Sequence, residues 1–158
     1  MKKFFLSVFV VTLSVLTISC GSDDDNNDED NGGSQEQLTV NIDGQQLTFD
    51  SIIVGQTVFS DGTELDVTAT IGGGTGRIIT FYTYVGDVGA NAILNFTYTL
   101  DGVYYSAFSS GTNLVTVVNV NNGARLEVNF SGILAGYDEV IQEEVFVTIE
   151  NGTLLVDY

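Results

Sequence analysis

The sequence predicts an all-β fold for residues 38–158, an antiparallel β-sandwich of about nine to eleven strands. Apolar and polar residues alternate with a period of two in residues 65–71 and 124–130, as in strands that bury one face. Val, Ile, Thr, Tyr and Phe, which favour pleated and half-buried surfaces, dominate this segment, and helical spacing is absent. Because hairpin-joined strands also suit closed sheets, an up-and-down β-barrel is the alternative.

The predicted strands follow the chain in short steps. They span residues 38–43, 45–49, 51–59, 64–71, 77–85, 93–100, 103–109, 113–120, 124–132, 143–150 and 153–157. The turns between them are marked by dipeptides that tolerate positive φ, namely Asp43-Gly44, Asp61-Gly62, Asp101-Gly102, Asn122-Gly123 and Asn151-Gly152. The last dipeptide predicts a closing hairpin. The run Gly72-Gly73-Gly74-Thr75-Gly76 predicts a strand connection, since it lacks the Lys and the helix of a phosphate-binding loop.

Residues 1–19 have the pattern of a secretory signal peptide. Lys2 and Lys3 precede an apolar run, and the small residue Ser19 precedes Cys20, the only cysteine. This pattern resembles the lipobox of bacterial lipoproteins, although Thr17 stands where that family favours Leu. The resemblance implies cleavage after Ser19 and a diacylglyceryl thioether plus an N-acyl chain on Cys20.

Residues 20–37 are predicted to be a disordered, acidic tether, because they carry many carboxylates and no apolar side chain. The acidic run beginning at Ser22, Asp23, Asp24 and Asp25 resembles the export signal that places Bacteroidota lipoproteins on the outer face of the outer membrane. The periplasmic face of the same membrane is the alternative.

The strand-rich domain also resembles small Bacteroidota lipoproteins of uncharacterised function. The likeness lies in residues 93–98, 125–132 and 147–154. It supports the all-β prediction and implies no chemistry.

Composition excludes several functions. Beyond the predicted signal peptide, Arg77 and Arg125 are the only cationic side chains, while the chain carries 21 carboxylates, so nucleic acid is not an expected partner. Without histidine, and with the one cysteine carrying lipid, the usual activating bases, zinc sites and disulfides are missing, and we expect no enzyme. The net charge of −17 favours solubility and disfavours self-association.

Four local patterns predict sites. Tyr82 and Tyr84 share one face of a strand and, with Tyr104 or Tyr105, could form a platform for stacking a sugar ring. The carboxylates of the irregular segment 136–144 could gather Ca²⁺; they are Asp138, Glu139, Glu143 and Glu144. Ser51, in Asp50-Ser51-Ile52, resembles a Bacteroidota O-glycosylation acceptor. Arg125 and Glu127 share an outward face, which predicts an ion pair.

These observations predict a non-catalytic lipoprotein that acts as a binding module for a glycan or for a neighbouring surface protein. A passive coat or assembly component without a small ligand is the alternative.

Overall fold

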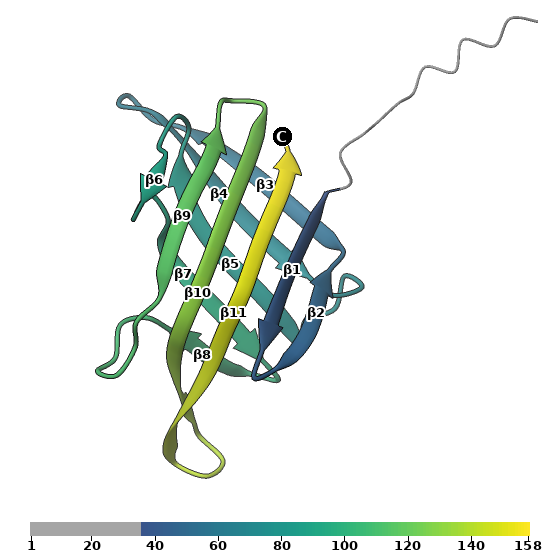
Figure 1. The fold of residues 1–158 in the computed structure, drawn as a ribbon, viewed down its shortest axis with the longest axis vertical. Helices are drawn as coiled ribbons and strands as arrows, with labels where there is room; N and C mark the ends of the chain where they lie inside the picture. Colours follow the sequence, from purple (N-terminus) through teal and green to yellow (C-terminus); the bar gives the residue numbers. More distant parts are fainter. Residues whose placement is uncertain (1–35) are drawn as a thin grey trace, which may run out of the picture. The chain divides into compact units, whose positions relative to one another are not determined.

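The structure, a computed structural model, describes residues 36–158 as one β domain (Figure 1). The predicted signal peptide, Cys20, the predicted export signal at residues 22–25 and nearly all of the predicted tether lie outside the described residues. No helix that could cross a membrane occurs among residues 36–158.

The domain consists of eleven strands in one antiparallel sheet. The strands are β1 (Gln37–Ile42), β2 (Gln45–Phe49), β3 (Ser51–Val58), β4 (Thr63–Thr70), β5 (Arg77–Tyr84), β6 (Gly89–Ala90), β7 (Leu94–Leu100), β8 (Val103–Ser106), β9 (Val115–Asn121), β10 (Arg125–Asp138) and β11 (Glu143–Asp157).

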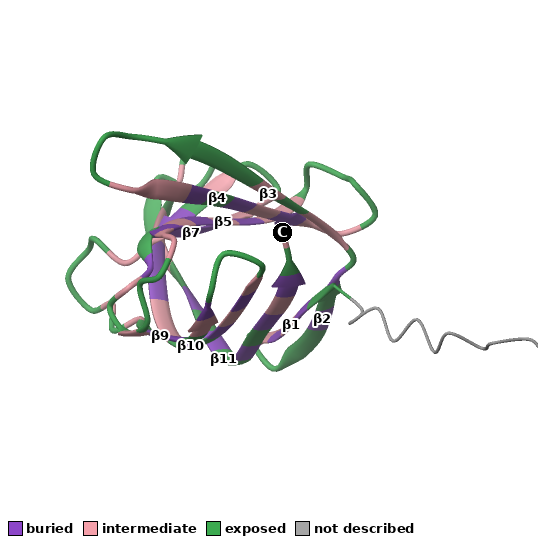
Figure 2. Cartoon of the chain, turned by 90° about the horizontal axis from the view of Figure 1, so that it is seen from above, coloured by how far each residue is buried: buried purple, intermediate pink, exposed green. Residues whose placement is uncertain are grey.

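The sheet folds into two facing walls and is nearly closed (Figure 2). The terminal wall comprises β2, β1, β11, β10 and β9, and the central wall comprises β8, β7, β5, β4 and β3. The two walls join where the second half of β10 pairs with β8. The predicted all-β, antiparallel fold class is therefore confirmed, and a nearly closed sheet fits both the sandwich and the barrel forms that the sequence allowed.

Alternating inward side chains of both walls form one core. Leu38, Val128 and Leu154 of the terminal wall and Val67 and Ile79 of the central wall are fully buried. The rings of Phe96 and Phe130 join the walls, with centroids 4.9 Å apart, at a distance typical of aromatic pairs. The period-two pattern in the sequence therefore corresponds to burial on the inner face.

Two predicted hairpins have the expected backbone. Asp43 and Gly44 both have positive φ, as do Asp101 and Gly102, in agreement with type I′ turns. The prediction of a hairpin at Asn151-Gly152 is wrong. Asn151 has a φ of 52°, but the chain continues straight through it as β11, and the register slips there against both β1 and β10. The dipeptide therefore forms a β-bulge, which needs the same left-handed residue.

Gly152 is required at this bulge. It lies opposite Phe130, and a Cβ atom added to it would overlap the Phe130 ring. Phe130 is buried in the core, so its ring cannot swing away into solvent.

The predicted irregular segment at residues 136–144 is also wrong in extent. β10 continues to Asp138 and β11 begins at Glu143, so a four-residue turn joins two long paired strands. The short strand β6, which pairs with β9, was not predicted because two residues give no periodicity.

Candidate functional site

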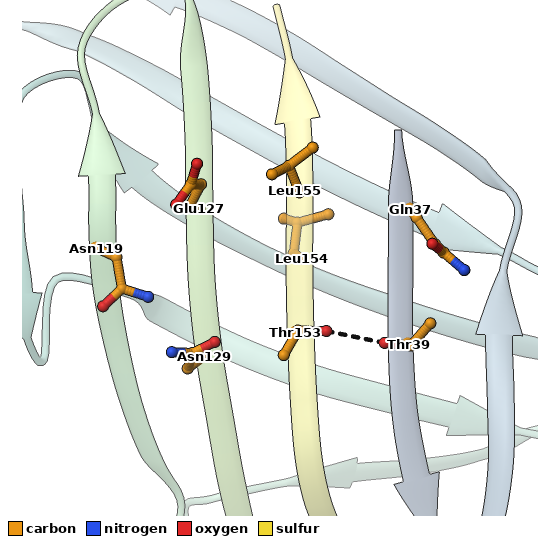
Figure 3. A pocket seen from close by; sticks show the side chains of 8 residues that line it. All are labelled: Gln37, Thr39, Asn119, Glu127, Asn129, Thr153, Leu154 and Leu155. Atoms are coloured by element: carbon orange, nitrogen blue, oxygen red, sulfur yellow. Dashed lines mark hydrogen bonds between the residues drawn. The ribbon is translucent and has the colours of Figure 1, made fainter. Parts of the chain in front are cut away.

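The outer face of the terminal wall carries a shallow trough that crosses four strands. Two adjoining hollows of about 360 and 400 Å³ form it, and they share Asn129 and Thr153. Figure 3 shows the residues that line the first of them. We call this surface the amide trough. Its polar side chains are Gln37, Thr39, Asn119, Glu127, Asn129, Ser131, Asn151 and Thr153.

The strand register places these side chains in rows. Thr39 of β1 lies opposite Thr153 of β11, Thr153 lies opposite Asn129 of β10, and Asn129 lies opposite Val117 of β9. In the next row Gln37, Leu155 and Glu127 are neighbours. Since alternate residues of a strand share a face, each strand contributes two outward side chains about 7 Å apart.

Two bulges border the trough. The register between β9 and β10 slips after Val120, which leaves Asn119 as an extra, exposed residue. The bulge at Asn151 does the same for β11, which lies within the trough between β1 and β10. Bulges redirect side chains and are common beside functional sites. Here each bulge adds an exposed asparagine to the trough.

The amide side chains of the trough make no hydrogen bonds within residues 36–158. This holds for Gln37, Asn119 and Asn129, whereas the hydroxyls of Thr39 and Thr153 bond to each other at 2.8 Å (Figure 3). Each free amide offers two N–H donors and one carbonyl acceptor. The trough therefore presents donors and acceptors that are open to a ligand.

Three other asparagines of the domain serve the fold. The side chain of Asn121 donates to the carbonyl oxygens of Tyr84 and Asp87, at 2.8 and 3.2 Å, and accepts the Tyr158 hydroxyl at 2.8 Å. Asn122 Oδ1 accepts two backbone N–H groups of its turn, and Asn113 Oδ1 accepts the N–H of Ile133. Unbonded amides also occur outside the trough, for example at Gln45, but in the trough three of them line one hollow.

The trough carries little charge. Its one carboxylate, Glu127, lies 3.8 Å from the guanidinium of Arg125, as the sequence predicted. The closer partner of Arg125 is Asp157, directly across on β11, with Nε and Oδ1 2.7 Å apart. The hydrogen bond and the charge of Asp157 raise the pKa of Arg125. Arg125 therefore stays charged and offsets Glu127 at the end of the trough.

Tyr82 and Tyr84 lie side by side on the outer face of β5, as predicted. Each is half-buried and faces a carboxylate of β4, Asp66 opposite Tyr82 and Glu64 opposite Tyr84. Partial burial, together with the charge of Glu64, raises the pKa of Tyr84. The hydroxyl of Tyr84 therefore lies in the field of a carboxylate of its own wall.

Tyr104 does not join that pair. Tyr104 lies opposite Thr99 of β7, and Thr99 lies opposite Ile78 of β5, so Tyr104 is two strands away from β5. Because Ile78 and Tyr82 are four residues apart, Tyr104 is also offset from Tyr82 by about 13 Å along the strand direction. Its neighbour is Tyr137 of β10, and both line a hollow with Asp101, Asp138 and Glu139. These two tyrosines are 56% and 57% exposed. Tyr105, in contrast, points into the core.

The four predicted calcium ligands are not brought together. Asp138 pairs with Glu143 across the hairpin, and its Oδ1 accepts the N–H groups of Val140 and Ile141. Glu143 and Glu144 are consecutive strand residues and point to opposite faces. In the part of the chain that the structure describes, no group of three or more Asp, Glu, His or Cys side chains could hold a metal ion.

Ser51 is the first residue of β3 and is partly exposed. The neighbouring Asp50 accepts the backbone N–H of Gly72 through Oδ1, at 2.6 Å, which fixes the glycine-rich connection. Modification of Ser51 stays a prediction.

Comparisons of the chain with known protein families, with curated proteins and with solved structures find no match.

Sequence reasoning missed the amide trough. The alternation in residues 124–130 does place Asn129 on the outward face with Arg125 and Glu127. Its neighbours Thr39 and Thr153 are far away in the sequence, and alternation within a strand gives no information on which strands are adjacent.

Proposed function

We propose that this protein is a non-catalytic, lipid-anchored binding module that holds a glycan in the amide trough. In this proposal the lipid on Cys20 attaches the chain to the outer membrane, and the acidic tether holds the β domain away from it on the cell surface. The supporting observation is the set of three unbonded amide side chains, Gln37, Asn119 and Asn129, that line one hollow of the trough.

A neutral, hydroxyl-rich ligand fits the chemistry of this surface. Amides can donate to and accept from sugar hydroxyls, and a ligand without charge needs no ionic partner in a trough whose single carboxylate is already paired. Val115, Val117 and Leu155 add apolar patches for the C–H faces of a sugar ring. The trough is open and shallow, so it suits an extended chain of sugars better than an enclosed small molecule.

A neighbouring surface protein is the second candidate ligand, and the exposed pair Tyr104 and Tyr137 favours it. Tyrosine is enriched in protein interfaces because one large ring contributes much contact area with few rotatable bonds. This pair lies at the end of the domain where β10 meets β8.

The test uses the full chain isolated from envelopes in detergent and applied to a glycan array. Fatty-acid labelling of this material is expected, and it should disappear in Cys20→Ser. We expect Asn119→Ala/Asn129→Ala to weaken glycan binding roughly 5- to 150-fold, because each of the two lost hydrogen bonds costs about 0.5–1.5 kcal/mol.

Gln45→Ala, which removes an exposed amide outside the trough, is the control and should bind like the wild type. Tyr104→Ala/Tyr137→Ala tests the second candidate in a pull-down from native envelopes. Absence of glycan binding, or equal binding by the Asn119/Asn129 double variant and the wild type, would contradict the glycan proposal.

A further inference from the structure

The strand β3 ends the sheet and has a free edge. It pairs with β4 along its whole length, and no other strand forms a ladder with it among the described residues. Figure 2 shows it as an exposed ribbon on the rim of the domain. Two of its apolar side chains, Ile53 and Val58, are 65% and 80% exposed.

The hydrogen-bond pattern shows which residues face that edge. The Phe59 N–H donates to the Gly62 carbonyl at 2.8 Å, so this pair is a hydrogen-bonded one. Such pairs alternate along antiparallel strands, so Thr57, Gly55 and Ile53 bond to β4. The N–H and C=O groups of Ile52, Val54, Gln56 and Val58 therefore point away from β4. The Thr63 carbonyl accepts the Val85 N–H at 2.8 Å and so points away from β3. This agrees with a Val58–Thr63 pair that is not hydrogen-bonded.

Nothing in the sequence blocks this edge. Natural proteins protect free edges with charged residues, proline or bulges. Residues 51–60 contain no charged residue and no proline, and the pairing of β3 with β4 has no register slip.

A second copy of β3 fits the edge in antiparallel orientation. With a two-fold axis at Gly55, Ile52 lies opposite Val58 of the second copy, and Val54 lies opposite Gln56 of the second copy. All four residues with free backbone groups then meet one another. The same alignment brings Ile53 next to Thr57 of the second copy and covers the exposed Val58.

Charge repulsion beside the two-fold axis is weak. Asp66, the carboxylate beside the axis, lies opposite Gly55 on β4. The two Asp66 residues would be three strand spacings apart, about 14 Å, which exceeds the Debye length of about 8 Å at physiological salt. The expectation from net charge that the protein avoids self-association therefore does not apply at the centre of this contact.

We propose that two copies of this chain associate through antiparallel pairing of their β3 strands about a two-fold axis at Gly55. The contact is one strand wide and smaller than a standard interface, so dissociation constants of roughly 1–100 µM are expected. Added salt should strengthen the dimer, since it screens the remaining repulsion between the two acidic domains.

Sedimentation of the full chain in density-matched detergent tests the association. We expect dimers in that concentration range and at least tenfold weaker association for Val58→Lys, which places a charge on the edge. Val140→Lys adds the same charge at a loop residue that is 92% exposed and should dimerise like the wild type.

A cysteine at the axis tests the register. Gly55 has ordinary space for a side chain, with the nearest atoms 3.7 Å from an added Cβ. Its pair across the axis would be a non-hydrogen-bonded one with Cα atoms about 4.5 Å apart, within disulfide range. Gly55→Cys should therefore form a disulfide-linked dimer under mild oxidation, whereas Val140→Cys should not. A monomer up to about 1 mM, dimers unaffected by Val58→Lys, or cross-linking of Gly55→Cys only to other proteins would overturn the proposal.

Discussion

The outward side chains of the two walls differ in their hydrogen-bonding groups. On the central wall, β4 and β5 present carboxylates and hydroxyls, such as Asp66 and Tyr82, and the hydroxyls of Thr80 and Thr97 bond to each other at 2.6 Å. On the terminal wall the amides of Asn119 and Asn129 have no partner within residues 36–158. The hollows on the terminal wall are shallow, so the open amide groups distinguish the trough better than shape does. The comparison teaches that free donors and acceptors locate a candidate site on a sheet without a deep cleft.

The largest expected effect concerns the bulge of the terminal wall. Gly152→Ala should destabilise the domain by about 1–3 kcal/mol and lower its melting temperature, because the added methyl group overlaps the buried ring of Phe130. Thermal unfolding followed by circular dichroism measures this. Gly55→Ala on the central wall is the matched control. Its added methyl group would make only ordinary contacts, so its stability should change by less than about 1 kcal/mol. Equal stability of the two variants would show that the bulge is not tightly packed.

A second comparison uses two asparagines of one strand, β9. Asn121→Ala should cost about 1–3 kcal/mol, because it leaves the carbonyl groups of Tyr84 and Asp87 without their side-chain donor and breaks a tie between the walls. Asn119→Ala, two residues earlier and exposed, should change stability by less than about 0.5 kcal/mol. Chemical denaturation of both variants gives the two values. A loss of stability in Asn119→Ala as large as that in Asn121→Ala would mean that the trough amides serve the fold.

The smallest expected effect is a loss of folding stability at alkaline pH, caused by two tyrosines of the central wall. Burial raises the pKa of Tyr98 on β7 above its ordinary value of 10.0, and burial also raises the pKa of Tyr105 on β8. The Tyr98 hydroxyl therefore holds its proton more tightly in the folded state than in the unfolded state. The stability that the protonated hydroxyl contributes is complete below pH 10.0 and is lost as the pH rises through the pKa of Tyr98 in the folded state.

Tyr98→Phe should therefore lose stability less steeply between about pH 10 and pH 11 than the wild type, as measured by denaturation at each pH. Phe96→Leu serves as the control, because it removes core contacts without an ionisable group and should lower stability without changing this slope. Identical slopes for Tyr98→Phe and the wild type would contradict the assignment to Tyr98.

Much of the fold could be predicted because its rules are local. Alternation gave the strands around Val67 and Val128, and Asp43-Gly44 gave a hairpin, since both patterns depend on a few consecutive residues. Asn151-Gly152 was misread for a physical reason. A left-handed residue serves a bulge as well as a turn, and only pairing with β1 and β10 on either side keeps the chain straight there.

The candidate site was less predictable because it depends on register. Tyr82 and Tyr84 could be placed together from their spacing alone, but Tyr104 could not be placed relative to them without the order of β5, β7 and β8. The same holds for Arg125. Its neighbour in sequence, Glu127, was found, whereas Asp157 on the adjacent strand was not.

The position of β11 between β1 and β10 has a consequence for biosynthesis. β1 meets its partners at residues 149–155 only after more than a hundred further residues have been made, which takes roughly 5–20 s at ribosomal speed. Until then the two-stranded piece formed by β1 and β2 has only a short hairpin to stabilise it. The nascent polypeptide should therefore remain unfolded, and able to pass through a translocation channel, until β11 has been synthesised. Truncation before β11 should prevent folding of the whole domain.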